Sequence, residues 1–344
     1  MKDEGKTHAV NRTEADDLTH PSSLILHPSG VTNVACAVIE RADGSFLLAQ
    51  RPSGKPYSGY WEFPGGKVES GESPRVALAR ELEEELGITV TLAYPWVTRM
   101  HSYTHATVRL HFFRVVQWNG EPHGREQQAF VWQHPHALSV APMLPANAPI
   151  FAALALPKVY AISNATEIGE ALFLAQLDTA LAQGTRLIQF REKTLPEVDA
   201  RRLLGEVLRR AHLQGARVLV NSAHPQEMQA MADGVHLTAA DLGRSFMRGF
   251  TRPAASLAGA SCHDAAELAR AAELGCDFAV LGPVALTASH PGGPALGWPK
   301  FREFVDNFPL PVYAIGGMRR NDLAVAWEHG AHGIAGMRSV WGEA

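Results

Sequence analysis

Cysteine is scarce in this chain of 344 residues, which has only Cys36, Cys262 and Cys276. No two of them form a Cys-x-x-Cys pair and three thiols cannot all pair with one another, so a disulfide scaffold or a structural zinc site is not expected. This usage fits a reducing cytoplasm. No apolar run reaches the ~18 residues that span a bilayer, and the polar N-terminal segment lacks the apolar stretch of a signal peptide. We therefore expect a cytoplasmic protein with no membrane partner.

An excess of positive charge is also absent, since the formal net charge is −4. This argues against a protein whose main partner is the backbone of long nucleic acid, but it allows a small phosphorylated ligand held with a metal. Hydrophobic residues make up 46 % of the chain and charged residues 19 %, a balance that supports a packed core rather than disorder. At roughly 150 residues per domain, the length predicts about two domains.

Composition divides the chain into three segments. Residues 1–30 are charged and aperiodic, and we expect a flexible lead-in there. Four prolines between residues 141 and 157 mark a boundary. The sequence therefore predicts a first domain over residues 31–157 and a second over residues 158–344.

The first domain has strand-like runs and one clear helix. Two apolar runs on either side of the turn at 42–44 predict a β-hairpin. A helix is predicted from Pro74 to Leu86, because Ser73 can cap its N-terminus and Gly87 can end it. These elements predict an α/β domain.

The second domain alternates short apolar runs with helical stretches. Eight such runs predict a closed parallel (β/α)8 barrel more than an open sheet. They lie at 159–163, 186–190, 217–221, 234–237, 256–261, 278–282, 311–317 and 333–337. Only eight residues follow Gly336, too few for a full eighth helix.

The most informative feature of the first domain is a group of glutamates on the predicted helix. Glu81, Glu84 and Glu85 are spaced i, i+3 and i+4, so their carboxylates share one helix face and repel one another. This arrangement is favourable if a hard divalent cation neutralises it, and all-oxygen ligands suit Mg²⁺ or Mn²⁺. Arg80 can orient Glu81 as a base. A solvated acidic helix face is the alternative interpretation.

The full spacing around these glutamates resembles the Nudix hydrolases. Every fixed position of the pattern GX5EX7REUXEEXGU is matched, by Gly66, Glu72, Arg80, Glu81, Glu84, Glu85 and Gly87. The resemblance implies an α/β/α sandwich with a mixed sheet that hydrolyses a nucleoside diphosphate linked to another group. It also implies a metal site made by Glu81, Glu84, Glu85 and the carbonyl of Gly65. Catalysis then rests on Glu81, Arg80 and Glu84, with Gly66 and Glu72 in support.

Residues 31–156 are further similar to the MutT branch of that family, which removes oxidised guanine nucleotides. The similarity lies in the segments 50–51, 60–67, 118–126 and 144–149. It implies that Asn147 reads the purine edge, that Phe63 and Tyr103 stack on or wall the base, that Arg51 and Lys67 contact substrate, and that Glu126 is a further metal ligand or base. His105 and Ala106 stand where the branch can have an arginine, which leaves discrimination of the oxidised base open.

These roles have plain structural alternatives. Phe63 and Tyr103 also fit a hydrophobic core. Asn147 precedes a helical stretch and also fits an N-cap. Glu126 also fits a surface loop charge.

The second domain resembles the thiamine phosphate synthase/TenI family over about residues 158–340. The matching segments are 189–193, 233–237, 281–284 and 311–317. Synthases of that family join a pyrimidine pyrophosphate to a thiazole phosphate with Mg²⁺. Two departures stand out, because Ser222 replaces a metal-binding aspartate and His290 replaces a pyrophosphate-binding lysine. The resemblance implies a ligand site formed by Arg191, Lys193, Asn221, Asp241, Gly316, Gly317 and Ser339.

Together these patterns predict an enzyme that hydrolyses 8-oxo-dGTP to 8-oxo-dGMP and pyrophosphate and so cleanses the nucleotide pool for DNA replication. The alternative is a thiamine-pathway enzyme or sensor whose Nudix domain removes thiamine pyrophosphate analogues. The barrel is then a synthase, a binding module for a thiamine-related phosphate, or a purely structural domain. The oligomeric state stays open.

Overall fold

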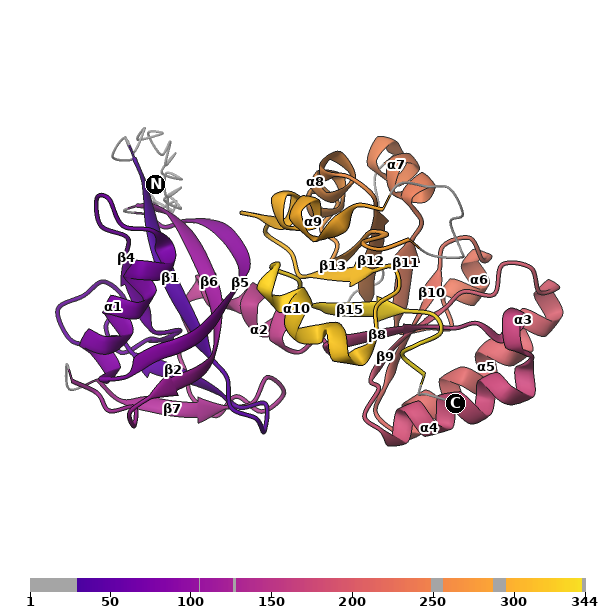
Figure 1. Cartoon of the computed structure of the whole chain (residues 1–344), viewed down its shortest axis with the longest axis horizontal. Helices are drawn as coiled ribbons and strands as arrows, with labels where there is room; N and C mark the ends of the chain where they lie inside the picture. The colour runs from indigo at the N-terminus through magenta and orange to yellow at the C-terminus, as the bar shows by residue number, and fades with distance from the viewer. Residues whose placement is uncertain (1–29, 105, 126–127, 249–255, 287–294, 342–344) are drawn as a thin grey trace, which may run out of the picture.

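The protein consists of two α/β parts that lie side by side (Figure 1). The computed structural model describes residues 30–104, 106–125, 128–248, 256–286 and 295–341. Residues 30–157, in indigo and magenta, form what we call the first part, and residues 158–341 form the barrel. The predicted lead-in, apart from Gly30, lies outside the described residues. No helix in the described ranges is long and apolar enough to cross a membrane.

The first part is built from two small sheets. A four-stranded mixed sheet has the order β4 (Gly65–Lys67), β1 (Val31–Ile39), β6 (Thr107–Asn119) and β5 (Thr89–Ser102), in which β1 and β6 are parallel. A three-stranded antiparallel sheet has the order β3 (Trp61–Glu62), β2 (Phe46–Gln50) and β7 (Phe130–Gln133). The predicted mixed sheet is confirmed.

The predicted hairpin is wrong. A tight turn does follow β1, where the Arg41 amide donates to the Ser45 carbonyl at 2.9 Å. Beyond it β1 and β2 separate into different sheets, because β1 pairs with β6 over nine positions while β2 pairs with β7. The inner residues of both strands are buried on both faces. Their pattern therefore carries no information about which partner each strand takes.

The helix α1 (Pro74–Leu86) has the ends that the sequence predicts. The Ser73 side chain accepts a hydrogen bond from the Val76 amide at 3.3 Å, and Gly87 ends the helix in the left-handed region at φ 63°. Ala77, Leu78, Leu82 and Leu86 are buried against the sheet. The glutamates of the helix therefore lie away from this apolar face, and two of them, Glu81 and Glu85, lie against the loop at Gly65 and Gly66.

The second part is a closed parallel barrel, as predicted. Its strands follow the order of the chain, and β15 closes the ring by pairing with β8. The strands are β8 (Val159–Ile162), β9 (Leu187–Phe190), β10 (Arg217–Asn221), β11 (Gly234–Leu237), β12 (Leu257–Cys262), β13 (Phe278–Leu281), β14 (Val312–Ile315) and β15 (Gly333–Gly336).

Helices surround this barrel, as Figure 1 shows. They are α3 (Ala165–Ile168), α4 (Glu170–Ala182), α5 (Glu197–Leu213), α6 (Gln226–Gln229), α7 (Ala239–Arg248), α8 (Ala265–Glu273), α9 (Gly297–Val305) and α10 (Leu323–Glu328). One apolar cluster lies between the strands and the helices, and a second fills the barrel interior around Tyr160, Phe278 and Tyr313. Short helical turns η1 (Pro145–Asn147) and η2 (Arg320–Asp322) and the connecting helix α2 (Ala148–Leu154) complete the described chain.

The two parts share a polar junction. The edge strand β5 bonds to the barrel, since the Thr98 amide donates to the Phe308 carbonyl at 3.0 Å and Arg99 Nη1 donates to the Pro309 carbonyl at 2.8 Å. The Arg114 side chain of β6 is fully buried there, with Nη2 3.2 Å from His332 Nδ1. The barrel therefore covers an edge that would otherwise be open to pairing.

Candidate functional site

Arg80 lies at the centre of the acidic site on α1. Its guanidinium donates to both carboxylate oxygens of Glu72, at 2.8 and 3.1 Å, and to Glu81 Oε1 at 2.9 Å and Glu84 Oε2 at 3.2 Å. These bonds hold the pKa of Glu72 at about 2, with the hydrogen bond from Arg80 as the main cause. The side chain that the sequence assigns to positioning Glu81 is in contact with it.

The loop at Gly65 and Gly66 packs directly on two of the glutamates. The Gly65 amide donates to Glu85 Oε2 at 3.3 Å. A Cβ added at Gly66 would lie 2.1 Å from Glu81 Cδ, so only glycine allows this approach of carboxylate to backbone. Gly65 itself has φ 141°, and a Cβ there would lie 2.0 Å from the Ala35 carbonyl oxygen. The two glycines thus let the backbone of this loop approach the carboxylates of Glu81 and Glu85 closely.

The donor set of this region fits a hard divalent cation. Glu85 has its pKa raised to about 7, first by burial and then by the charges of Glu62 and Glu81, while the Gly65 amide opposes the shift. A cation would relieve this repulsion, and carboxylate and carbonyl oxygens are its preferred ligands. In the described ranges, no three acidic, histidine or cysteine side chains are already gathered as a metal site, since Glu81 and Glu84 here bond to Arg80.

Asn147 and Phe63, two of the residues assigned to the base, are both buried. Asn147 is 4 % exposed, makes no capping bond, and its Nδ2 donates to the Trp61 carbonyl at 3.4 Å. Phe63 is 3 % exposed and packs on Phe46 and Phe151, with ring centroids 5.6 and 5.3 Å away. The structure thus places Phe63 in the apolar core, in keeping with the structural alternative.

The other assigned residues lie nearer the surface. Tyr103 is half-buried, with its ring centroid 5.4 Å from that of Tyr57. Arg51 is bound by its neighbours, because Nη1 pairs with Glu62 Oε2 at 2.6 Å and Nε donates to the Pro56 carbonyl at 2.8 Å. Lys67 is exposed, and its carbonyl accepts from Arg80 Nη2 at 3.1 Å. Glu126 and His105 lie outside the described residues.

Sequence reasoning missed Glu62. Burial raises the pKa of this carboxyl even though Arg51 opposes the shift, and its charge contributes after burial to raising the pKa of Tyr103 to about 12. Glu62 thus forms an ion pair with Arg51 and acts electrostatically on Tyr103. In the sequence, Glu62 is a single carboxylate between the aromatic residues Trp61 and Phe63. A single residue forms no periodic pattern, so nothing marked it as part of a site.

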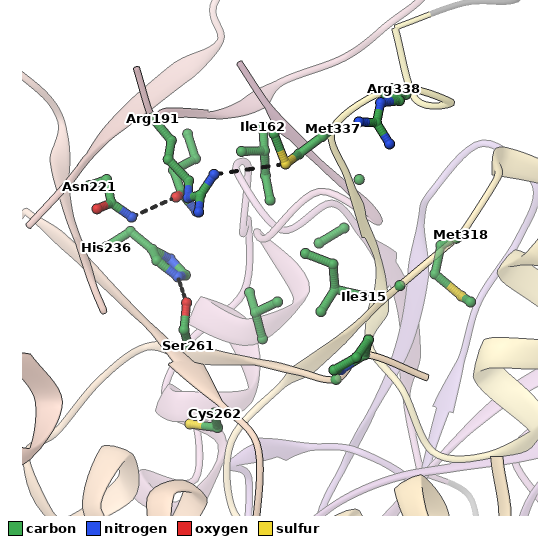
Figure 2. A pocket seen from close by; sticks show the side chains of 18 of the residues that line it. Ile162, Arg191, Asn221, His236, Ser261, Cys262, Ile315, Met318, Met337 and Arg338 are labelled. Carbon is green, nitrogen blue, oxygen red and sulfur yellow. Dashed lines mark hydrogen bonds between the residues drawn. The ribbon is translucent and has the colours of Figure 1, made fainter. Parts of the chain in front are cut away.

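A cavity of about 700 Å³ opens at the carboxyl ends of the barrel strands (Figure 2). Predicted residues that line it are Arg191, Lys193, Asn221, Gly316, Gly317 and Ser339. Gly316 has φ 114°, and a Cβ there would lie 2.7 Å from the Val284 amide nitrogen, so the loop requires glycine. In barrels of this kind, such loops and nearby cations commonly hold a phosphate.

Asp241, the remaining predicted residue of the barrel site, is bonded beside the cavity. Its Oδ2 accepts from Ser222 Oγ and from Thr238 Oγ1, both at 2.7 Å, and its Oδ1 pairs with Arg244. Hydrogen bonds from Ser222, Thr238 and Arg244, together with the charge of Arg244, lower the pKa of Asp241 against burial, its largest single influence. Both oxygens of Asp241 therefore accept hydrogen bonds, from three donors in total. Residue 222 is a serine, so it supplies no second carboxylate. These residues do not fit the Mg²⁺ that the synthase resemblance implies.

The floor of the cavity is a chain of neutral hydrogen bonds. Asn221 Nδ2 donates to Gln189 Oε1 at 2.9 Å, and Gln189 Nε2 donates to the Tyr160 hydroxyl at 3.2 Å. That hydroxyl lies 3.2 Å from His236 Nδ1. His236 Nε2 in turn lies 2.9 Å from Ser261 Oγ, a bond that Figure 2 shows.

The direction of this chain follows from the charge of His236. Burial first, and then the charges of Arg191 and Lys193, lower its pKa to about 3, so the imidazole is neutral. The Tyr160 hydroxyl accepts from Gln189. In the His236 tautomer with its hydrogen on Nε2, that hydroxyl donates to Nδ1 and Nε2 donates to Ser261. The Ser261 hydroxyl hydrogen can then face a bound ligand.

Comparison with known proteins assigns both parts. Residues 31–154 match the NUDIX domain family and residues 159–340 match the thiamine monophosphate synthase family. The chain is 42 % identical over 120 residues to CTP pyrophosphohydrolase of Escherichia coli (strain K12), covering 35 % of this chain and 88 % of that protein. It is 41 % identical over 118 residues to 8-oxo-dGTP diphosphatase of Haemophilus influenzae, covering 34 % of this chain and 87 % of that protein.

The barrel has its own relatives. It is 32 % identical over 182 residues to a protein of Aquifex aeolicus provisionally named thiamine-phosphate synthase 2, covering 53 % of this chain and 96 % of that protein. The chain therefore belongs to the Nudix hydrolases through residues 31–154 and to the thiamine monophosphate synthase family through residues 159–340.

Proposed function

We propose that the Nudix pyrophosphohydrolase of the first part acts on oxidised purine nucleoside triphosphates, above all 8-oxo-dGTP, and releases 8-oxo-dGMP and pyrophosphate. The observation that carries this proposal is the Arg80-centred cluster of Glu72, Glu81 and Glu84 beside the Gly65–Gly66 loop. Relatives named for 8-oxo-dGTP and for CTP support a nucleotide triphosphate as the substrate class. Cleansing of the nucleotide pool in the cytoplasm would be its role.

The acidic site would hold Mg²⁺, or Mn²⁺ in its place. Glu81, Glu84, Glu85 and the Gly65 carbonyl are the proposed ligands, and Glu126 is a proposed further ligand. When bound, the cation neutralises phosphate oxygens and lowers the pKa of water. Arg80 orients Glu81, which can take a proton from the attacking water, while Glu72 holds Arg80 in place. The chain's own contribution is then mostly positioning and charge stabilisation.

Asn147, Arg51, Tyr103 and Lys67 are the proposed substrate contacts. An amide can donate and accept at once, so Asn147 suits the edge of a purine. The hydrogen bond from Asn147 to the Trp61 carbonyl is long, at 3.4 Å, so replacing it with a hydrogen bond to a base would cost little free energy. Tyr103 offers a ring face next to Tyr57. Phe63, which the sequence also assigned to the base, supports this region from the core.

The experiment is a product analysis with 8-oxo-dGTP, dGTP and CTP in the presence of Mg²⁺. The proposal predicts a nucleoside monophosphate and pyrophosphate in equal amounts, and loss of turnover when the cation is chelated. Release of inorganic phosphate alone, or turnover that survives chelation, would contradict it.

A specific observation favours a second function for the barrel, namely binding of a thiamine-related phosphate. Arg191 and Lys193 supply positive charge at one side of the cavity, and the neutral floor at His236 and Ser261 suits an uncharged ring. We place the barrel domain at residues 158–344 and the Nudix domain at residues 31–157. Calorimetry with hydroxyethylthiazole phosphate and thiamine phosphate tests this proposal, and absence of heat with both would contradict it.

A further inference from the structure

Two buried cations share one carboxylate at the junction between the two parts. Glu40 accepts from Arg114 Nη1 at 3.5 Å and from Lys158 Nζ at 3.4 Å. No other ion pair of either cation is found among the described residues. The remaining polar neighbour of Arg114 is His332, whose pKa burial lowers well below its usual value, so it adds no charge. Arg114 Nε has no hydrogen-bond partner in the described chain.

The excess of positive charge is visible at Lys158. Its pKa is lowered to about 7, first by burial and then by the charge of Arg114, and the single carboxylate of Glu40 does not offset these effects. The Lys158 side chain is 28 % exposed. Lys158 also lines a cleft, from which a ligand could reach the side chain.

This cleft of about 660 Å³ lies between the two parts, and we call it the junction cleft. Its charged and titratable lining residues are Glu40, Arg41, Asp43, His134, His136, Lys158 and Arg186. Counted with Lys158 protonated, the basic side chains Arg41, Lys158 and Arg186 of the cleft, together with Arg114 behind its wall, exceed the carboxylates of Glu40 and Asp43 by two positive charges. The cleft also has an apolar wall that includes Pro135, Leu154 and Trp327.

We propose that the junction cleft binds a small molecule that bears a phosphate dianion, with Lys158 and Arg186 as its principal charged donors. A dianion balances the two excess charges, and charge-assisted hydrogen bonds from cations to phosphate are among the stronger ones. The apolar wall leaves room for an organic remainder. This site is separate from the barrel cavity and from the acidic helix, and it needs residues from both parts of the chain.

The residues of the cleft explain why both parts are needed. Arg41 lies on the turn after β1 and is fixed by stacking over Trp132, 3.6 Å from the ring centroid. Arg186 precedes β9 in the barrel, and its Nη1 donates to the Leu181 and Thr185 carbonyls at 2.7 and 2.9 Å. Both guanidiniums are thus held in place before a ligand arrives, which reduces the entropy lost on binding.

Calorimetry of the full chain with inorganic phosphate and with sulfate, at constant ionic strength and without divalent metal, tests the proposal. Both are tetrahedral anions, and sulfate stays dianionic across neutral pH. Lys158→Met should weaken one binding event by about tenfold or more, equivalent to about 1.4 kcal/mol. Lys193→Met, the matched control in the barrel cavity, should leave that event unchanged. Equal affinity in wild type and Lys158→Met, or no binding of either anion, would overturn the proposal.

A second readout does not depend on how Lys158→Met folds. Sulfate bound next to Lys158 favours the ammonium form, so the pKa of Lys158 in wild type should rise on addition of sulfate, as measured by NMR of labelled lysine. An unchanged pKa with saturating sulfate would contradict the proposal. Repeating the calorimetry with phenyl phosphate separates free phosphate from a phosphorylated organic molecule, because only the latter has an apolar group that can contact the apolar wall.

Discussion

Ser222 Oγ donates a 2.7 Å hydrogen bond to Asp241 Oδ2 at the carboxyl end of the barrel. The serine thus satisfies the carboxylate that a metal would otherwise use. Thr238 donates to the same oxygen, and Arg244 pairs with the other. The barrel cavity thus has the cations Arg191 and Lys193 in its lining, but it lacks an acidic pair for a divalent ion.

Binding of hydroxyethylthiazole phosphate to the barrel should therefore be independent of metal. We expect affinities with Mg²⁺ and with a chelator to agree within about twofold in calorimetry. Ser222→Asp puts a second carboxylate beside Asp241, and like charges at this distance favour a cation. This variant should gain a dependence on Mg²⁺. A loss of about tenfold or more in wild-type affinity on chelation would contradict the interpretation.

Glu84→Gln should reduce nucleotide hydrolysis by about 10²-fold or more, because the residue is a proposed metal ligand; that factor corresponds to about 2.7 kcal/mol. The melting temperature should change little, since the side chain is largely exposed. Glu83→Gln is the matched control on the same helix, because the Glu83 carboxylate accepts a hydrogen bond from Thr89 Oγ1 at 2.9 Å and is not a proposed metal ligand. Equal turnover in the two variants would refute the assignment of Glu84.

The two glycines of the acidic site should respond differently to alanine. At Gly66 the new Cβ meets the carboxylate of Glu81 at about 2.1 Å, and this flexible side-chain end can move away. Gly66→Ala should thus lower kcat strongly and stability by less than about 1 kcal/mol. At Gly65 the Cβ meets the Ala35 carbonyl and φ is 141°, so Gly65→Ala should mainly destabilise the fold. Kinetics and chemical denaturation of both variants check this contrast.

Lys158 should make the stability of the protein depend on pH in the alkaline range. Its pKa is about 7 in the folded chain against 10.5 in the unfolded one, so between these values the unfolded state binds more protons. Stability contributed by this group therefore rises as the pH increases from 7 toward 10.5. Wild type should gain stability relative to Lys158→Met over this range in thermal denaturation. Parallel pH profiles would contradict the charge imbalance at the junction.

Local signals in the sequence predicted the elements that local chemistry determines. Ser73 and Gly87 delimit α1 because capping is a property of adjacent residues. The eight apolar runs predicted the barrel because each strand is a short, mostly apolar segment that is buried within the ring. The contact of Arg80 with the adjacent Glu81 was predicted. The contact of Arg80 with Glu84 was not, although it is an i, i+4 pair of the kind that meets on a helix.

Contacts between distant residues were not predictable in this way. The predicted hairpin at 42–44 was wrong because β1 and β2 pair with β6 and β7, which lie far along the chain. Arg114 gave no signal, since its neighbour His332 is 218 residues away and polar residues such as Arg109 and His111 also occur along its strand. A phenylalanine at position 63 is compatible with both a core position and a contact with a base. Only its 3 % exposure in the structure shows that it packs in the core.

The most direct test of the central claim is steady-state hydrolysis by the full chain with Mg²⁺, comparing 8-oxo-dGTP, dGTP and thiamine pyrophosphate. The account predicts that kcat/KM for 8-oxo-dGTP exceeds that for dGTP by about 10²-fold or more, equivalent to about 2.7 kcal/mol of transition-state binding. Faster turnover of thiamine pyrophosphate, or equal values for the two guanine nucleotides, would contradict it and would remove the role proposed for Asn147.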